Sequence, residues 1–358
     1  MAVYKIFPSK DATIYSEYPS VNTGLDAILD LSKSTSFLDE ANASVCRSLI
    51  KFSTYDINKV ITSYITTGSF SASLKMYLAN TENIPTEFDL EVRAVSQDWD
   101  MGTGKYEESP IVSDGVTWSS SSLGQGWVFG AGSTGSYKGV PGGGSWVTGS
   151  VYTQSFGPYT SKDIDINVTG IVKSWISASY GNYGFIVKNS EALEFNKNYK
   201  YTLQYFSRDT HTIYPPSLDI KWDDSQFSPS NPNKICSNGN INVSLQNSNF
   251  SYREDSICKI RINVRDKFPT RTFSTTSLYT NNKYLPSSSY WSLIDYKTKD
   301  IVIDFDDSAT KISADVSGSY FTLFMNGLEP ARYYEVLIKS VIGNEVLIFD
   351  NDYIFKVE

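Results

Sequence analysis

The stretch Ser71-Ala-Ser-Leu-Lys-Met-Tyr-Leu78 alternates between two kinds of residue along its whole length. Its even-numbered positions are Ala, Leu, Met and Leu, whereas its odd-numbered positions are Ser, Ser, Lys and Tyr. Successive side chains of a β-strand point to opposite faces of its sheet, so this alternation predicts a strand with one buried face. The same alternation recurs at residues 88–94, 218–222, 259–265 and 301–305. The sequence therefore predicts antiparallel sheets that are buried on one side.

Helical spacing occurs in only two places. Apolar residues recur every three or four positions over residues 57–65, where we expect Asp56 as the cap and Gly68 as the stop. A second short stretch covers residues 171–176, behind Thr169. Neither is long enough to build a helical domain. Many short strands with one or two decorating helices predict an all-β fold of the β-sandwich or jelly-roll kind.

The chain length of 358 residues favours two domains, since a domain has roughly 100 to 200 residues. A polar stretch from Asp223 to Asn233 contains two prolines, which are excluded from central strands. We therefore predict a first β-sandwich over residues 1–224, a linker over 225–239 and a second β-sandwich over 240–358.

Composition and charge exclude several classes of protein. Hydrophobic residues make up 40% of the chain, so it can bury a core and is not a disordered tail. The net charge of -8 argues against nucleic-acid and anionic-membrane partners, which need clustered Lys and Arg. We find neither a secretory signal at the N-terminus nor an apolar run near the roughly 18 residues of a spanning helix, so we expect synthesis and assembly in the cytoplasm.

Three cysteines, at positions 46, 236 and 258, fit a protein that folds in a reducing compartment. A disulfide between Cys236 and Cys258 and a pair of free thiols both remain open. Cys46 alternates with Ser48, Ile50 and Phe52, which favours a buried thiol in a strand.

The segment from Ser119 to Thr160 is rich in glycine and aromatic residues. Glycine permits close backbone approaches, and aromatic rings supply large contact areas, so a loop of this kind is often functional. Packing against its own sandwich or at a subunit interface, stacking on a glycan, and disorder are the three alternatives. The candidate contact residues are Trp127, Phe129, Tyr137, Trp146 and Tyr152.

Short motifs follow one another along the first 224 residues: Asp11-Ala-Thr-Ile-Tyr15, Asn22-Thr-Gly24, Arg47-Ser-Leu-Ile-Lys-Phe52, Gln97-Asp-Trp99 with Gly102, Gly115-Val-Thr-Trp118, Asp165-Ile-Asn-Val-Thr169, Trp175, Asn182-Tyr-Gly-Phe185, Ser207-Arg208 and Pro216-Ser-Leu-Asp-Ile220. In this order they resemble the DNRLRE domain, a β-sandwich similar to carbohydrate-binding modules and common in cell-surface and phage structural proteins. The resemblance implies a jelly-roll β-sandwich for binding or structure, with Trp99, Trp118 and Trp175 as structural residues. It brings no catalytic residues and leaves the ligand open.

The stretch from Gly327 to Ile338, Gly-Leu-Glu-Pro-Ala-Arg-Tyr-Tyr-Glu-Val-Leu-Ile, resembles fibronectin type III and related immunoglobulin-like sandwiches. There, a Tyr four residues after the Pro forms a tyrosine corner, in which its hydroxyl bonds to nearby backbone. This implies that role for Tyr334, with Leu328 in the core; a plain hairpin is the alternative. The wider C-terminal segment resembles the end domain of structural proteins in contractile-tailed phages.

Residue types needed for catalysis or metal binding are sparse. The one histidine, His211, stands in an expected surface turn, and the cysteines form no CxxC pair, so neither a catalytic triad nor a zinc site is supported. Acidic pairs such as Glu107 and Glu108 are typical of solvated turns, although paired carboxylates can hydrolyse glycosides. A structural calcium at Asp11 and Asp30 is an alternative. We expect no metal, no cofactor and no catalytic residue.

These observations together predict a non-enzymatic structural protein of a bacteriophage virion. It would attach to other virion proteins at the tail, baseplate, neck or capsid surface, and self-association is left open. The alternative is a carbohydrate-binding or adhesion module that recognises host surface glycans. A glycan-degrading enzyme comes third, because the sequence offers no identifiable acid and base pair.

Overall fold

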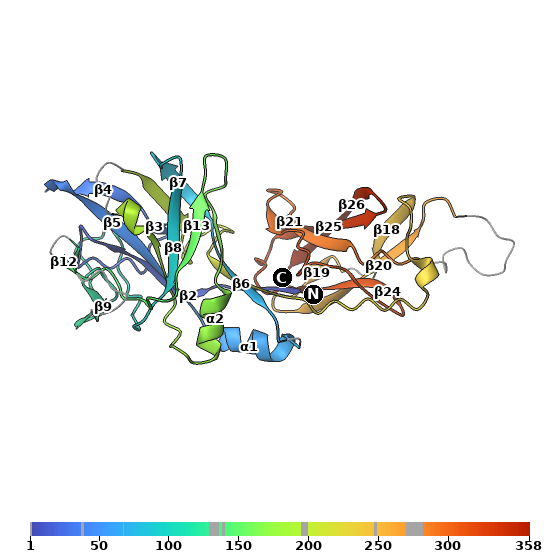
Figure 1. Cartoon of the computed structure of the whole chain (residues 1–358), viewed down its shortest axis with the longest axis horizontal. Helices are drawn as coiled ribbons and strands as arrows, with labels where there is room; N and C mark the ends of the chain where they lie inside the picture. The colour runs from blue at the N-terminus through green and yellow to red at the C-terminus, as the bar shows by residue number, and fades with distance from the viewer. Residues whose placement is uncertain are drawn as a thin grey trace. The chain divides into compact units, whose positions relative to one another are not determined.

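The computed structural model describes residues 2–36, 39–66, 68–128, 136–137, 140–194, 200–246, 249–269 and 282–358. The chain divides into two compact units, each dominated by strands (Figure 1). The N-terminal unit holds Ile6–Val60 and Ser71–Asp219, and the C-terminal unit holds Met1–Lys5, Ile61–Phe70 and Ile220–Glu358. The expected all-β, sandwich-type fold is confirmed.

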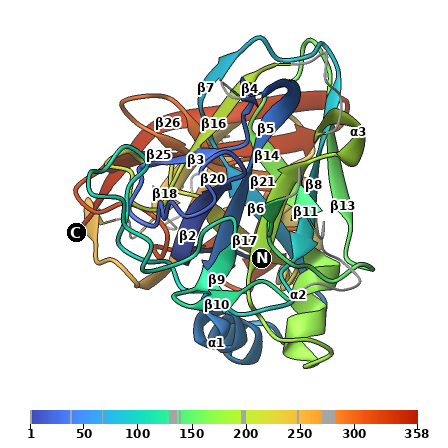
Figure 2. The ribbon, with the colours of Figure 1, turned by 90° about the vertical axis from the view of Figure 1, so that its left-hand side faces the viewer.

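The N-terminal unit is built on an antiparallel sheet with the order β13-β8-β15-β5-β2, in which β4 also pairs with β5. Figure 2 shows β2 and β5 running side by side through this unit. The strands of the sheet are β2 (Pro8–Tyr15), β4 (Lys33–Ser36), β5 (Asp39–Phe52), β8 (Phe88–Ala94), β13 (Tyr152–Phe156) and β15 (Phe185–Asn189).

Smaller sheets complete the N-terminal unit. One has the order β3-β16-β7, and in another β6 lies between β14 and β17, of which residues 217–219 belong to this unit and 220–222 to the C-terminal unit. Two short ribbons pair β9 with β10 and β11 with β12. The bounds are β3 (Ile28–Asp30), β6 (Ser71–Met76), β7 (Leu78–Glu82), β9 (Ser120–Ser122), β10 (Gln125–Gly126), β11 (Ser136–Tyr137), β12 (Val140–Pro141), β14 (Ile164–Asn167), β16 (Thr202–Phe206) and β17 (Ser217–Trp222).

The period-two pattern explains how β6 and β8 are buried. Ala72, Leu74 and Met76 are fully buried on one face of β6. The regular alternation ends at Tyr77, however, because Leu78 begins the separate strand β7 and is only half-buried. In β8, the residues from Phe88 to Ala94 alternate between buried and more exposed positions. Alternation therefore predicted these strands and their inner faces.

Both expected helices are present, with caps that differ from the expectation. Helix α1 (Thr54–Tyr64) begins after Ser53, whose hydroxyl accepts from the Asp56 N–H at 3.3 Å, so Ser53 takes the capping role expected of Asp56. Helix α2 (Thr169–Ile176) has no side-chain cap, because its N-cap residue is the apolar Val168; the Thr169 hydroxyl accepts from the Ala72 N–H at 2.8 Å. A four-residue helix, α3 (Glu191–Glu194), follows β15.

The C-terminal unit packs two sheets around one core. Their orders are β18-β20-β24-β23 and β19-β26-β25-β21-β22, and all pairs are antiparallel except β19 with β26. Trp291 and Phe321 stack in the core with ring centroids 5.1 Å apart. The strands are β18 (Ile241–Gln246), β19 (Ser251–Tyr252), β20 (Ile257–Asp266), β21 (Ser289–Asp295), β22 (Ile301–Ile303), β23 (Ser313–Asp315), β24 (Gly318–Phe324), β25 (Tyr333–Ile342) and β26 (Glu345–Val357).

Segments from outside residues 225–358 also belong to the C-terminal unit. Strand β1 (Ala2–Ile6) contributes Val3 to its core. Tyr4, Tyr64 and Trp222 surround Phe324, with ring centroids 5.1 to 5.7 Å from it. The division by contacts therefore differs from the expected N-terminal domain of residues 1–224, because these aromatic side chains pack on a strand more than 100 residues beyond Trp222.

Residues 225–239, which the sequence predicts as a linker, are part of this unit. The backbones of Gln226 and Ser228 exchange hydrogen bonds with Ala314. The Cys236 N–H donates to Tyr284 O at 2.9 Å, and the Cys236 side chain lies in the core. A 3-10 helix, η1 (Pro232–Lys234), begins with Pro232, and Pro229 lies in a stretch without regular structure. Both prolines are thus outside the strands, as expected of residues that cannot donate to a sheet.

Candidate binding site

The glycine-rich aromatic segment turns two of its candidate contact residues inward. Trp127 and Trp146 are only 3% and 4% exposed. They share a core cluster with Trp99 and Trp118, so these two rings follow the alternative in which the segment packs against its own unit. The Trp127 Nε1–H donates to Thr117 O at 3.1 Å, which satisfies its polar edge inside the protein.

Close backbone packing explains this burial. Gly142 has a φ of +131°, and a Cβ at this position would lie 1.8 Å from Trp118 O. The next residue, Gly143, donates its N–H to the same Trp118 oxygen at 2.8 Å. Only glycine fits at Gly142, so the Gly142-Gly143-Gly144 triplet lets the segment pass directly over Trp118.

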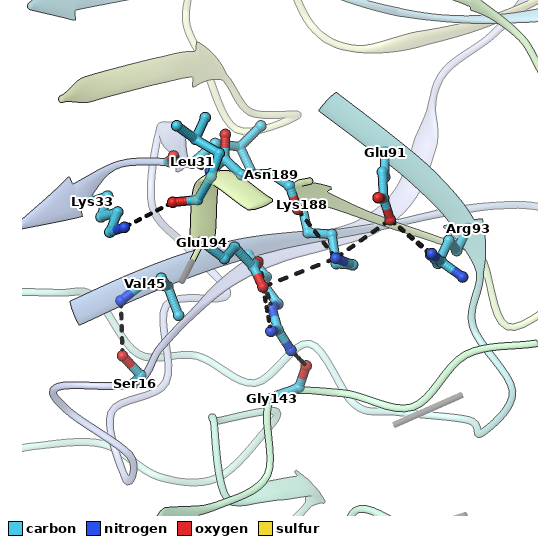
Figure 3. Close-up of polar contacts among 12 residues, drawn as sticks. Ser16, Leu31, Lys33, Val45, Glu91, Arg93, Gly143, Lys188, Asn189 and Glu194 are labelled. Atoms are coloured by element: carbon cyan, nitrogen blue, oxygen red, sulfur yellow. Dashed lines mark hydrogen bonds and ion pairs between the residues drawn. The ribbon is translucent and has the colours of Figure 1, made fainter. Parts of the chain in front are cut away.

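Figure 3 shows a buried ion network in this unit. The cations of Arg47 and Lys188 in this network lie 5.0 to 5.7 Å from the ring centroid of Trp118 or Trp146. Arg47 donates to both carboxylate oxygens of Glu194, at 3.0 and 2.8 Å, and to Gly143 O at 2.6 Å. Lys188 lies 3.9 Å from Glu194 and 3.4 Å from Glu91, which also pairs with Arg93 at 2.8 Å. Buried charges are tolerated only with such partners. This network therefore has a structural role: it holds the glycine-rich aromatic segment against the rest of the unit.

The remaining aromatic candidates have separate positions. Tyr152 is half-buried on β13, with its hydroxyl against Gly170. Tyr137 contributes its backbone to β11, and its side chain lies outside the described residues. Phe129 also lies outside them. The described side chains among these candidates, Trp127, Trp146 and Tyr152, therefore do not form one exposed surface.

The structural residues expected from the two resemblances are buried. Trp99 donates its Nε1–H to Tyr183 O at 2.8 Å, and Trp175 packs on Phe185 with ring centroids 4.7 Å apart. The Tyr334 hydroxyl accepts from the Glu329 N–H at 2.7 Å and lies 3.3 Å from Glu329 O. Leu328 lies in the core. Tyr334 thus makes the hydroxyl-to-backbone bonds of a tyrosine corner.

The side chains that the sequence offered for catalysis or metal binding lie at separate places in the structure. His211 is exposed in a bend, and all three cysteines are free. Asp11 accepts from the Arg208 N–H at 2.7 Å, whereas Asp30 accepts from the Tyr15 hydroxyl at 2.8 Å. Within the described residues, no three His, Cys, Asp or Glu side chains gather as metal ligands. Over the same residues, no helix has the length and apolar character needed to cross a bilayer.

The motifs around Asn22 converge in space. Buried Asn22 donates from Nδ2 to Met101 O and Val116 O, at 2.7 and 2.8 Å, and its Oδ1 accepts from the Gly104 N–H at 2.8 Å. A Cβ at Gly24 would lie 2.2 Å from Met101 O, so only glycine allows this approach. One amide side chain therefore fastens the loop after Trp99 to the first turn of the unit.

Residues that follow the two joined segments along the chain, from Asp26 and from Lys105 onward, line a pocket. The pocket has a volume of about 520 Å³, within the usual range for small-molecule sites, and its described lining is Tyr15, Asp26, Ala27, Ile28, Asp30, Lys105, Tyr106, Glu107, Glu108 and Gln204. The rings of Tyr15 and Tyr106 meet with centroids 4.6 Å apart, and Tyr18 packs edge-on against Tyr106 at 5.6 Å. The strand end at Asp26–Asp30 and the loop at 105–108 thus face one another across the pocket.

Carboxylates dominate the electrostatics of this pocket. Four acidic side chains and one lysine line it, which gives a formal charge of -3. Burial raises the pKa of Asp26 to about 6, opposed by the Tyr106 N–H that donates to it and reinforced by the negative charge of Asp30. Burial and the neighbouring Asp30 also raise the pKa of Tyr15, which therefore stays protonated and donates to Asp30. The pocket is an anionic site with aromatic walls.

Comparisons with known proteins leave the family open. No family model matches the chain, and no curated protein matches it. A solved structure of a DUF4785 family protein from Legionella pneumophila is similar at 9% identity, with a TM-score of 0.18. The match covers 100% of this chain and 62% of that structure. A likeness this weak carries no argument about function.

Sequence reasoning reached this pocket only in fragments. It singled out Asp30 for a structural calcium and Glu107 with Glu108 as an acidic pair, but it did not bring them together. Asp26 and Tyr106 were missed, because they lie 80 positions apart in the sequence and meet only in the folded chain, where the Tyr106 N–H donates to Asp26. The one local signal was a tyrosine directly before two glutamates.

Proposed function

We propose that this chain is a non-enzymatic structural protein of a bacteriophage virion that attaches to other proteins of the particle. The observation that carries the proposal is a set of apolar side chains on the outer face of the five-stranded sheet of the C-terminal unit, where Ser292 and Lys339 also lie. A solvated sheet face is expected to be polar. Exposed contiguous apolar surface is typical of contact with another protein.

The strand registers define this outer face. Val346 lies opposite Val341, and Ile348 lies opposite Lys339 on the same side of β25 and β26. Val346 and Ile348 are 62% and 59% exposed. On β21, Tyr290 continues the face beside Lys339, whose ammonium group lies 5.0 Å from the Tyr290 ring centroid.

The face extends to the edge of the sheet. Ile294 on β21 lies opposite Ile301 on β22, which is 58% exposed. Lys339 is covered by aromatic rings on two sides, because its ammonium group also lies 4.8 Å from the centroid of Phe305. We call Tyr290, Ile301, Val341, Val346 and Ile348 the apolar face, and we propose that another protein of the particle covers it.

The test is the protein content of purified particles. We expect the chain in gradient-purified virions by mass spectrometry, and we expect Ile348→Lys to reduce its incorporation at least tenfold. Val316→Lys is the matched control, since Val316 is 75% exposed on the turn between β23 and β24, in the other sheet. Particles that lack the chain altogether would overturn the proposal.

Recognition of host glycans is the alternative function. Two of the rings expected to stack on sugars, Trp127 and Trp146, are buried, which disfavours this alternative. Glycan-array binding by the purified chain is the measurement that would revive it.

A further inference from the structure

We propose that the pocket between Tyr15 and Tyr106 binds a protonated amine or guanidinium group. This site goes beyond the proposed attachment function, because it lies in the N-terminal unit and the apolar face lies in the C-terminal unit. Its ligand chemistry follows from the shape of the pocket, its aromatic walls and its charge.

The pocket is large enough for an organic group. Its volume of about 520 Å³ far exceeds the space that a bare metal ion needs. Tyr106 and Tyr15 both line the pocket, with Tyr106 38% exposed and Tyr15 5% exposed. Cations are attracted to the faces of aromatic rings within about 6 Å of the centroid. The exposed tyrosine thus provides an apolar and electron-rich wall.

The polar groups of the pocket are mostly acceptors. Asp26, Asp30, Glu107 and Glu108 supply carboxylate oxygens, against a single ammonium group from Lys105. The Tyr15 hydroxyl already donates to Asp30 and fixes the orientation of that carboxylate. A ligand with several N–H donors and a positive charge would complement this lining, because charge-assisted hydrogen bonds to carboxylates are the strongest available here.

A neutral sugar or a metal ion fits less well. A sugar hydroxyl both donates and accepts, and Lys105 and Gln204 offer it donors, but a neutral sugar leaves the formal charge of -3 uncompensated. A calcium ion needs six to eight oxygen ligands, and the described residues provide no cluster of three metal-binding side chains. An organic cation satisfies the excess negative charge without a closed coordination shell.

Two sources supply the same chemistry. One is a Lys or Arg side chain of a protein partner, and the other is a free polyamine. Spermidine and N-acetyl-arginine amide serve as probes for the two sources, with glucose and calcium chloride as probes for the competing ligand classes.

The experiment is isothermal titration of the full-length chain with each probe. We expect saturable binding of at least one of the two cationic probes, weakened at least tenfold in Asp26→Asn and in Glu107→Gln. Asn keeps an oxygen that can accept from the Tyr106 N–H, and Glu107 is exposed, so both variants should fold. Glu87→Gln is the matched control, because it removes one exposed carboxylate outside the pocket.

Each outcome decides the proposal. Tighter binding of spermidine points to a free polyamine, whereas tighter binding of the arginine amide points to a partner side chain. No binding of either probe, equal binding in Asp26→Asn and wild type, or a preference for glucose or calcium would overturn the proposal. Circular dichroism of each variant confirms the fold, and none of these results depends on whether the chain occurs in virions.

Discussion

At the scale of single residues, the buried side chain of Arg47 connects several distant parts of the N-terminal unit. It is fully buried and binds Glu194 on one side and Gly143 O on the other, beneath the rings of Trp118 and Trp146. Removing one partner of such a pair leaves the other charge buried without compensation, which is far more costly than losing the pair as a whole.

We therefore expect Arg47→Met to lower the free energy of unfolding by about 3–5 kcal/mol, because Glu194 would lose its main charged partner. Urea denaturation followed by tryptophan fluorescence measures this. Lys356→Met, which removes the partly exposed pair with Glu358, should cost about 1 kcal/mol or less. Equal costs for the two variants would contradict a structural role for the buried network.

Asp11 gives a prediction about pH. Burial raises its pKa to about 7, although the Arg208 N–H that donates to it acts in the opposite direction. Unfolded Asp titrates near 3.9, so between about pH 4 and 7 the folded state binds more protons than the unfolded state. Stability from this group therefore falls as pH rises through that window.

In Asp11→Asn this fall should disappear, and the difference from wild type should be on the order of 4 kcal/mol across the window, at about 1.4 kcal/mol per pKa unit. The measurement is the free energy of unfolding at pH 4, 5.5 and 7.5 for wild type, the variant and Glu87→Gln. Parallel curves for wild type and Asp11→Asn would show that Asp11 is not the titrating group.

At the scale of elements, glycine residues determine the backbone conformation and the position of the connection 140–146, more than the strands around it do. Gly142 lies against the backbone of Trp118 with a φ of +131°, a conformation that L side chains rarely adopt. A side chain at Gly142 would strain the backbone and would also collide with Trp118 O, so a small shift of the segment cannot relieve both.

For this reason Gly142→Ala should destabilise the N-terminal unit by more than about 2 kcal/mol, combining backbone strain with overpacking. Gly149→Ala is the control, since a Cβ there meets nothing within 4 Å. Thermal unfolding of both variants gives the comparison. A neutral Gly142→Ala would mean that the segment does not depend on its contact with Trp118.

At the scale of the whole molecule, the first residues of the chain stabilise the C-terminal unit. Tyr4 is 7% exposed, packs on Phe324 and Tyr64, and accepts from Asn326 Nδ2 at 2.8 Å. The two ends of the sequence thus contribute to one core.

Tyr4→Ala should destabilise the C-terminal unit by about 3–5 kcal/mol, as for other large aromatic truncations in cores. Hydrogen exchange read by mass spectrometry should show faster exchange in β24 and β25 than in wild type, with β8 and β15 unchanged. Tyr159→Ala, at a side chain that is 99% exposed, is the control. Faster exchange confined to the N-terminal unit would contradict this assignment.

The sequence by itself determined the local elements of this protein. The alternation at 71–76 and 88–94 predicted strands and their buried faces, and the apolar spacing at 57–65 and 171–176 predicted both longer helices. Tyr334 was also predictable, because its hydroxyl bonds to backbone only five residues away. These features depend on neighbours along the chain, and the sequence records such neighbours directly.

Only the tertiary structure decided where the aromatic segment and the pocket lie. Trp146 is buried against Arg47 and Lys188, which lie far from it in the sequence, and Trp127 shares one core cluster with Trp99, Trp118 and Trp146. The two sides of the pocket meet where the Tyr106 N–H donates to Asp26, 80 positions away in the sequence. A ring in a glycine-rich loop has the same local pattern whether it is covered or exposed. Whether such a ring is buried depends on which distant segments of the chain cover it. The spacing of residues in the sequence does not reveal those contacts.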